Sequence, residues 1–259
     1  MYFVIQGFSL FFIQYMSNIL FIMKFTLFIP TLNEIVGVKA IMPRIKKEWV
    51  DEIIIVDGHS TDGTKEYLES LGYKVISQKL PGTSGAWQEG FQAATGNVII
   101  LFSPDGNSIP EKIPQLVEKM KNGYDLAIVS RYKDGAKSED DDWLSALANF
   151  SFNKIINFLF RSNYTDALVM YRAFKKDILN KLDFNQDTGK NFNKYNCGLY
   201  EILISIRCAK AKLKIAEISG DEPSRLDGTK DSRAHPGKFI KMYNGLLMLY
   251  YIFKEYFSR

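Results

Sequence analysis

Two stretches near the start of the chain decide its fold: residues 25–34 read FTLFIPTLNE, and residues 52–64 read EIIIVDGHSTDGT. Each begins with a nearly continuous run of β-branched and aromatic residues, and the runs are stopped by Pro30 and by the Asp57-Gly58 pair. Uninterrupted apolar runs are typical of strands that are covered on both faces, as in parallel sheets. Both stretches therefore predict a buried strand that leads into a polar loop.

The same pattern continues along the chain. Further short strands are predicted at residues 75–77, 97–102, 126–129 and 214–218, and helical patterns at residues 64–71, 84–94, 110–122, 144–160 and 199–211. Alternation of strand and helix up to about residue 130 predicts βαβ units with right-handed crossovers. The expected fold class is α/β: a Rossmann-like, mostly parallel sheet flanked by helices, with apolar helices at the two termini.

Composition excludes several classes of protein. The 259 residues carry 33 Lys and Arg against 29 Asp and Glu, a net charge of +4, which is too weak for a nucleic-acid partner. Two cysteines and two histidines are too few for a disulfide framework or a Cys/His zinc site. The aromatic content of 14% is unusual, and many of these residues lie near the two ends. We therefore expect contact with a membrane surface.

Residues 1–23 contain no charged side chain, and five polar residues dilute an otherwise apolar run. Three interpretations remain open. The segment is a weak membrane anchor, an interfacial or partner-packing helix, or an upstream extension of a protein whose translation starts at Met23. No basic segment or small-residue cleavage site marks a signal peptide.

Residues 236–259 predict an amphipathic, aromatic C-terminal helix. Its longest uncharged run, Met242–Phe253, is too short to span a bilayer. Tyrosines and flanking lysines suit a helix that lies in the headgroup layer. The alternative is a terminal helix packed on the core or on another subunit of a homo-oligomer.

Polar residues follow four of the predicted strands, at the edge of the sheet where ligands bind in such folds. These segments are Pro30-Thr31-Leu32-Asn33-Glu34, VDGHSTDGT (56–64), Ser103-Pro104-Asp105-Gly106-Asn107 and Ser130-Arg131-Tyr132. One Asp-Gly pair alone would indicate a turn. Four polar clusters in succession at one edge predict a binding site. The acidic run at residues 139–142 instead predicts a solvated, mobile loop.

These segments, together with DALVMYRAF (166–174), resemble the family 2 glycosyltransferases of the GT-A fold, in particular the branch that contains the dolichol-phosphate mannosyltransferases. The resemblance covers residues 24 to about 235, which we take as the catalytic domain. It implies transfer of a sugar, with inversion, from a nucleotide-diphosphate sugar. It also implies a divalent cation, and oxygen ligands suit Mg²⁺ or Mn²⁺.

The resemblance assigns roles on the donor side. Asp57 would accept a hydrogen bond from the base and Glu34 from the ribose, with Pro30, Thr31, Leu32 and Asn33 beside them. The family's metal motif has two aspartates separated by one residue. Here the first position is Ser103, so Asp105 alone would hold the metal, with Pro104 and Asn107 nearby. A site with a single carboxylate, completed by diphosphate oxygens and water, is expected.

Basic residues are the candidates for phosphate contacts, since the guanidinium fork matches phosphate oxygens. Arg131 and Arg172 would contact donor or acceptor phosphates, although Arg172 has the alternative of pairing with Asp166. Arg225 and Lys230, in a late basic motif, would close over the diphosphate. Asp166 would act as a general base if the acceptor is a hydroxyl.

The preferred acceptor is a polyprenyl phosphate at the inner face of the cell membrane, which makes the protein cytoplasmic and peripheral or weakly anchored. The alternatives are transfer to a glycan hydroxyl in polysaccharide or glycoprotein assembly, and a non-catalytic module that binds nucleotide sugars.

Overall fold

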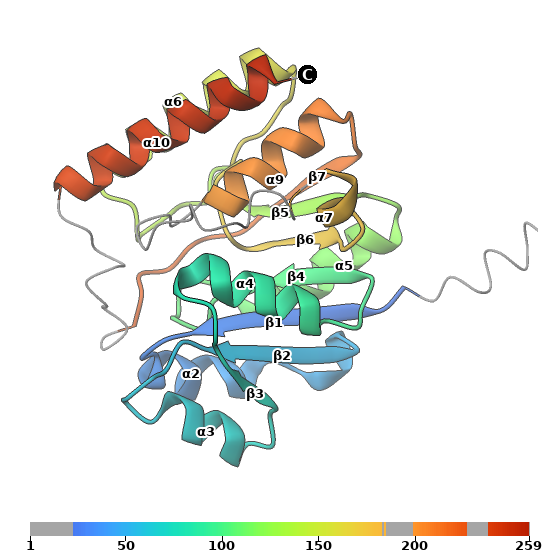
Figure 1. Cartoon of the computed structure of the whole chain (residues 1–259), viewed down its shortest axis with the longest axis vertical. Helices are drawn as coiled ribbons and strands as arrows, with labels where there is room; N and C mark the ends of the chain where they lie inside the picture. Colours follow the sequence, from blue (N-terminus) through green and yellow to red (C-terminus); the bar gives the residue numbers. More distant parts are fainter. Residues whose placement is uncertain (1–22, 183, 185–198, 227–237, 259) are drawn as a thin grey trace, which may run out of the picture.

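A computed structural model describes residues 23–182, 184, 199–226 and 238–258. These residues form a seven-stranded sheet with the order β3-β2-β1-β4-β6-β5-β7 (Figure 1). The strands are β1 (Phe25–Thr31), β2 (Glu52–Asp57), β3 (Val75–Ser77), β4 (Val98–Leu101), β5 (Leu126–Ser130), β6 (Arg172–Lys175) and β7 (Ile215–Ser219).

The sheet is mostly parallel, as the sequence predicts. Strand β1 pairs in parallel with β2 and β4, and β5 pairs in parallel with β7. Strand β6 lies between β4 and β5 and runs antiparallel to both. The carboxyl ends of β1, β2, β4 and β5 therefore lie at one edge of the sheet, and so do the four polar segments that follow them.

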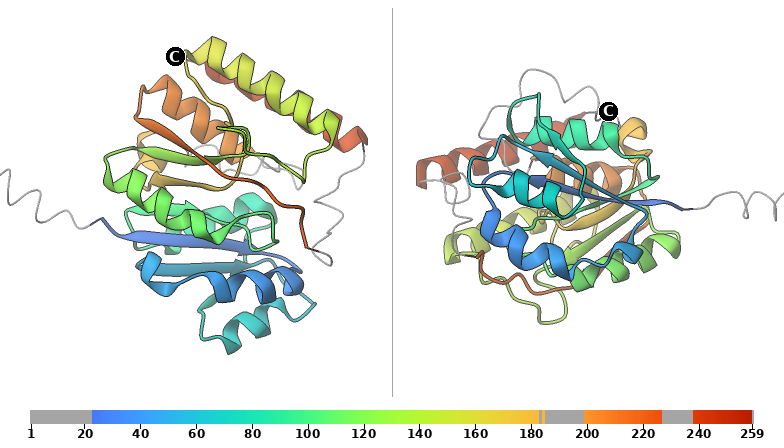
Figure 2. Two further views of the ribbon diagram at one scale, coloured as in Figure 1. Left: turned by 180° about the vertical axis from the view of Figure 1, so that it is seen from behind. Right: turned by 90° about the horizontal axis from the view of Figure 1, so that it is seen from below.

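Helices cover both faces of the sheet: α4 and α9 lie on one face, and α2 and α5 on the other (Figures 1 and 2). The helices are α2 (Ile35–Ile41), α3 (Thr64–Ser70), α4 (Gly82–Ala93), α5 (Ile113–Lys121), α6 (Trp143–Phe160), α7 (Ile178–Lys181), α9 (Leu199–Lys210) and α10 (Lys238–Phe257). Short 3₁₀ turns occupy Met42–Arg44, Lys47–Trp49 and Pro110–Lys112. The expected α/β architecture is confirmed.

Helix α2, strand β6 and the short helix α7 are absent from the sequence prediction. Helix α2 is short and contains Gly37 and two β-branched valines, which lower its intrinsic helix propensity. Strand β6 spans four residues and begins with an arginine, so it lacks the apolar run of a buried strand. Tertiary packing stabilises both α2 and β6, since Val38 and Ile41 of α2 and the first three residues of β6 are buried.

Helices α6 and α10 lie together beyond strand β7, at one end of the molecule (Figures 1 and 2). The C-terminal helix α10 spans Lys238–Phe257. The segment 1–22, and with it the expected N-terminal helix, lies outside the described residues. In the part of the chain that the structure describes, no helix combines the length and apolarity needed to cross a bilayer.

Candidate active site

The loops after β1 and β2 are joined by hydrogen bonds from backbone N–H groups of one loop to side chains of the other. We call residues 31–35 and 57–64 the donor loops, after the role that the sequence analysis predicts for them. The Asn33 N–H donates to Ser60 Oγ at 2.9 Å, and the Thr61 N–H donates to Asn33 Oδ1 at 2.8 Å. The Glu34 N–H donates to Thr64 Oγ1 at 2.9 Å. The donor loops therefore form one unit at the edge of the sheet.

Asp57 organises its own loop. Its carboxylate is buried and accepts hydrogen bonds from Ser60 N–H at 3.0 Å, from Ser60 Oγ at 2.5 Å and from Thr31 Oγ1 at 3.3 Å. These contacts explain why an aspartate ends this strand. The expected contact of Asp57 with a base stays a prediction.

Asp62 is a member of the donor loops that the sequence prediction missed. Its carboxylate accepts hydrogen bonds from Thr64 Oγ1 at 2.6 Å, from Thr64 N–H at 3.0 Å and from Ile35 N–H at 3.0 Å. Burial by itself raises its pKa, but these hydrogen bonds outweigh burial and lower it. The signal in the sequence is an Asp two residues before a helix, followed by Gly63, whose φ of 91° is left-handed.

The loop after β4 packs closely against α2. A Cβ atom on Gly37 would lie 2.3 Å from the Pro104 carbonyl oxygen, so only glycine permits this approach. The loop carries Asp105, which is 3% exposed and accepts a hydrogen bond from Asn107 N–H at 3.2 Å. The structure thus brings Ser103–Asn107 beside the helix that follows Glu34.

Arg225 supplies the positive charge next to Asp105. Its Nη1 lies 3.3 Å from Asp105 Oδ2, and its Nε donates to Asp140 Oδ2 at 3.0 Å. The Leu226 N–H donates to the Asp105 carbonyl at 3.0 Å. Burial raises the pKa of Asp105 above its ordinary value, although Arg225 opposes that effect. Arg225 thus lies at the predicted metal carboxylate, while Lys230 lies outside the described residues.

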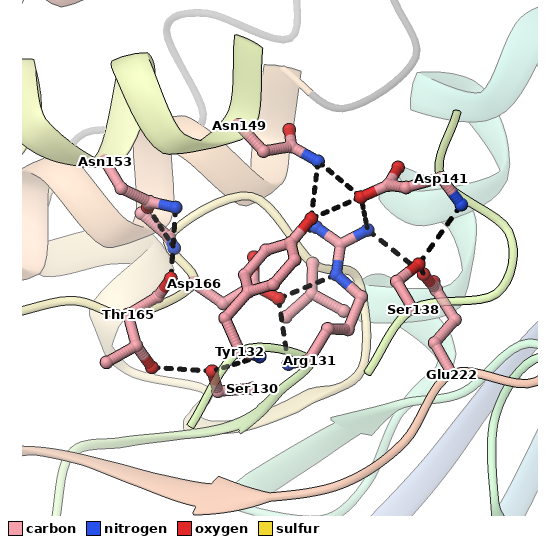
Figure 3. A network of polar contacts seen from close by, with 12 residues as sticks. Ser130, Arg131, Tyr132, Ser138, Asp141, Asn149, Asn153, Thr165, Asp166 and Glu222 are labelled. Carbon is pink, nitrogen blue, oxygen red and sulfur yellow. Dashed lines mark hydrogen bonds and ion pairs between the residues drawn. The ribbon is translucent and has the colours of Figure 1, made fainter. Parts of the chain in front are cut away.

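A second group of charges follows β5, and we call Arg131, Asp141, Asp166 and Glu222 the arginine cluster (Figure 3). Arg131 binds Asp166 with two parallel contacts, Nε to Oδ2 at 2.7 Å and Nη2 to Oδ1 at 3.0 Å. Its backbone N–H also donates to Asp166 Oδ2, and Nη1 lies 3.2 Å from Glu222 Oε2. Burial alone would lower the pKa of Arg131, but its carboxylate partners raise it.

This arrangement differs from the roles predicted for Arg131 and Asp166. Asp166 is fully buried, and both of its oxygens are bound by Arg131. As placed, it offers no open carboxylate to a hydroxyl acceptor. The Arg131 guanidinium is bound by the carboxylates of Asp166 and Glu222. The Arg131–Asp166 pair therefore holds the loop after β5 against the loop before β6.

The carboxylates of the acidic run at residues 139–142 bond to other parts of the chain, which the expectation of a solvated, mobile loop did not include, although Glu139 and Asp142 are exposed. Glu139 accepts a hydrogen bond from Ser224 N–H, and Asp140 binds Arg225. Asp141 accepts hydrogen bonds from Tyr132 and Asn149 (Figure 3). Asp142 caps α6 by accepting from Ser145 N–H at 2.7 Å. Each carboxylate has a separate structural role.

The prediction that Arg172 contacts a phosphate is wrong, and so is its alternative of an ion pair with Asp166. Arg172 is fully buried, and Nε donates to Val169 O at 2.9 Å. Nη1 donates to Glu201 O at 2.7 Å and to Ser205 Oγ at 2.9 Å. Arg172 therefore ties the chain before β6 to α9. The adjacent Glu201 carboxyl is also buried, and burial raises its pKa to about 7.

The described residues fit a metal site that has one protein carboxylate. Within that part of the chain no cluster of three or more His, Cys, Asp or Glu side chains is arranged to hold a metal ion. Mg²⁺ commonly binds through one or two carboxylates together with substrate phosphates and water. Asp105, buried at the edge of the sheet beside a cationic side chain, suits that mode.

Comparisons with known proteins identify the family and the fold of this chain. The sequence model of the family described as Glycosyl transferase family 2 matches residues 26–183. A dolichol-phosphate mannosyltransferase of Pyrococcus furiosus is 39% identical over 126 residues, which are 46% of this chain and 36% of that protein. The match thus covers about a third of the archaeal enzyme's length.

Other relatives cover more of the chain. A polyprenol monophosphomannose synthase of Mycolicibacterium smegmatis is 25% identical over 74% of this chain and 80% of its own length. Among solved structures, glucosyl-3-phosphoglycerate synthase of Mycobacterium tuberculosis, crystallised with Mn²⁺, UDP and phosphoglyceric acid, superimposes with a TM-score of 0.67. The sequence identity is 17%, and the match covers 92% of this chain and 80% of that one. Because the family model spans more than half of the chain, the protein is a member of the family 2 glycosyltransferases.

Proposed function

We propose that this glycosyltransferase moves a sugar from a nucleoside-diphosphate sugar to a polyprenyl phosphate, with inversion at the anomeric carbon. The observation that carries the proposal is the position of Asp105 and Arg225. A buried carboxylate and a guanidinium lie together at the sheet edge, next to the donor loops. A divalent cation and a diphosphate are the ligands whose charges match this pair.

The acceptor side favours a phosphate over a hydroxyl. A hydroxyl acceptor needs a general base, and the carboxylate predicted for that role, Asp166, is enclosed by Arg131. A phosphate oxygen is already anionic and needs no base. The names of relatives point the same way, since they include a polyprenol monophosphomannose synthase and an undecaprenyl-phosphate mannosyltransferase.

The proposed reaction is a single in-line displacement. An oxygen of the acceptor phosphate forms a bond to the anomeric carbon, while the bond from that carbon to the donor diphosphate breaks. The bonding electrons leave with the nucleoside diphosphate. Attack on the face opposite the leaving group inverts the anomeric centre.

The residues have distinct parts in this reaction. Asp105 would hold Mg²⁺ or Mn²⁺, and the cation, when bound, neutralises charge on the departing diphosphate. A cation on Asp105 would replace Arg225 as its partner and leave the guanidinium to the diphosphate. The donor loops would hold the base and ribose through Asp57 and Glu34, as the family resemblance implies. A lipid acceptor places the enzyme at the membrane, peripherally on the cytoplasmic face.

The test is Asp105→Asn in a transfer assay with UDP- and GDP-sugars, Mg²⁺ or Mn²⁺, and a polyprenyl phosphate. Removing a metal carboxylate is expected to lower turnover at least about 100-fold, because stabilisation of the leaving group is lost. The far-ultraviolet circular dichroism spectrum should stay unchanged.

The matched control is Asp134→Asn, which makes the same substitution on an exposed loop. Its φ of 51° is tolerated by asparagine, so activity should be retained. Wild-type turnover in Asp105→Asn would refute the metal role. Donor binding without transfer to phosphate or hydroxyl acceptors would identify a non-catalytic binding module instead.

A further inference from the structure

An apolar surface on α6 and α10 lies outside the candidate active site, and we call it the α6–α10 surface. Among the described residues, every exposed large apolar side chain except Val36, Leu71 and Leu80 lies on these two helices. The members are Trp143, Leu144, Leu147, Phe150, Phe158, Phe239, Met242, Tyr243, Leu246, Tyr250, Phe253, Tyr256 and Phe257. A protein that stays monomeric in water rarely exposes so much contiguous apolar area.

The exposed side chains form a stripe along each helix. On α6 they recur at residues 143, 147, 150 and 158, and on α10 at residues 239, 242, 246, 250, 253 and 257, the spacing of one helix face. The two helices run side by side in the same direction. Phe160 and Tyr256 form an edge-to-face ring pair at 6.1 Å, and Gly245 lies near Phe152. The stripes therefore belong to one pair of packed helices.

The inward face of α10 packs against α9 and α6. Ile252 is fully buried, and Glu255 forms an ion pair of 2.5 Å with Arg207 of α9. Lys210 Nζ donates to the Glu255 carbonyl at 2.8 Å. These contacts fix the rotation of the helix, and its apolar stripe points away from the core.

Apart from Glu255, the charged residues of these two helices are all lysines. Lys154 and Lys254 are exposed, and Lys238 and Lys241 occur at the start of α10. The one carboxylate within the two helices, Glu255, is turned inward to Arg207. A second copy docked on the same surface would bring lysines without any carboxylate from these helices to pair with them. An anionic lipid surface offers both an apolar layer and negative charge.

We propose that the α6–α10 surface lies on an anionic phospholipid bilayer, with the aromatic side chains in the headgroup layer and Lys154 and Lys254 at the lipid phosphates. The amino-terminal ends of both helices lie on the same side of the molecule as the carboxyl edge of the sheet (Figure 1). The proposal deepens the proposed function and rests on it for the lipid nature of the acceptor.

The experiment is co-sedimentation of the full chain with vesicles that contain no acceptor lipid. Vesicles of phosphatidylcholine alone are compared with vesicles that contain about 30% phosphatidylglycerol. Binding is expected on the anionic vesicles and should weaken at high salt. The double variant Phe158→Ser with Phe257→Ser removes side chains that are 83% and 78% exposed, and it should weaken binding at least about tenfold.

Matched controls test whether binding depends on this surface rather than on the total number of exposed apolar or charged side chains. Leu71→Ser with Leu80→Ser removes two exposed apolar side chains elsewhere and should leave binding unchanged. Lys154→Glu with Lys254→Glu should weaken binding at least about 30-fold, because each of the two lysines contributes roughly 1 kcal/mol near an anionic surface and every 1.4 kcal/mol is a factor of ten. The control for charge is Lys74→Glu with Lys79→Glu, both on exposed side chains near β3.

Equal binding by the phenylalanine variant and its control would overturn the proposal. A second result would also overturn it: the wild type does not bind vesicles, forms a dimer in sedimentation equilibrium, and this dimer dissociates in the phenylalanine variant. The α6–α10 surface would then be a contact between two copies of the chain. Donor binding, measured by calorimetry with nucleoside diphosphate and Mg²⁺ in the absence of vesicles, reports on the proposed function separately. If nucleoside diphosphate does not bind, the proposed function is refuted, while the vesicle measurement still tests the α6–α10 surface.

Discussion

The donor loops and the arginine cluster lie at the same edge of the sheet but are stabilised by different interactions. In the donor loops, hydroxyl, amide and carboxylate side chains accept hydrogen bonds from backbone N–H groups, mostly at part-exposed positions. In the arginine cluster, a buried guanidinium binds carboxylates that are 35 and 91 residues away in the sequence. The donor loops are thus stabilised by hydrogen bonds at exposed and part-buried positions, whereas the cluster is stabilised by charged contacts around one guanidinium.

Asp166→Asn is expected to have the largest effect on stability. It removes one charge of a buried pair and leaves Arg131 with poorer partners, which costs about 3 kcal/mol of unfolding free energy. Urea unfolding measures the loss. The matched control is Asp177→Asn, which breaks an exposed ion pair with Lys181 and should cost less than about 0.5 kcal/mol.

The same variant distinguishes a support from a catalytic base. If Asp166 only positions Arg131, turnover per folded molecule should fall far less than it does in Asp105→Asn. Unchanged stability combined with lost turnover would show that Asp166 acts directly on the acceptor, and the contrast between the two regions would fail.

The pH dependence of stability should come partly from Glu201, beside the buried Arg172. Its folded pKa of about 7 lies above its unfolded value, so the folded state binds a proton more tightly between about pH 4.5 and 7. Stability should therefore fall as pH rises through that window. Glu201→Gln resembles the protonated form and should flatten this part of the curve in urea unfolding from pH 4.5 to 8. A curve that keeps its slope would contradict the assignment.

Asp62→Ala should have the smallest effect on stability and a clear effect on ligand binding. Three hydrogen bonds at a partly exposed site are lost, at a net cost of about 1 kcal/mol. Because the pKa of Asp62 is lowered, its contribution is present near neutral pH and lost as pH falls through the folded pKa. Calorimetry with nucleoside diphosphate should show weaker binding. Asp51→Ala, at a carboxylate that bonds Phe25 N–H at the opposite edge of the sheet, should leave that binding unchanged.

The contrast between the two regions also explains what the sequence could predict. The donor loops are built from contacts between residues that follow adjacent strands, so strand runs and polar ends were sufficient to locate Asn33, Glu34 and Asp57. The partners of Arg131 and Arg172 could not be read in this way. The partners of these guanidinium groups depend on the antiparallel position of β6 in the sheet and on the packing of α9 beside it. Neither arrangement can be recognised from neighbouring residues in the sequence.

The acidic run at residues 139–142 also shows that contacts between separate segments cannot be predicted from local sequence. Four adjacent carboxylates indicate a solvated loop when only their neighbours in sequence are considered. In the folded chain, Asp140 binds Arg225, which is 85 residues away in the sequence, and Asp141 lies near Arg131 at the end of β5. The assignment of residues 24–235 as the catalytic domain, and of the ends as appendages, stays a prediction.

The contacts of residues 139–142 have a consequence for the length of this loop. Four consecutive positions contact the Ser224 backbone, Arg225, the Tyr132 hydroxyl and the first turn of α6. Inserting or deleting one residue would displace several of these carboxylates from their partners at once, even if every side chain were kept. In close relatives, residues 139–142 should therefore show substitutions more often than insertions or deletions.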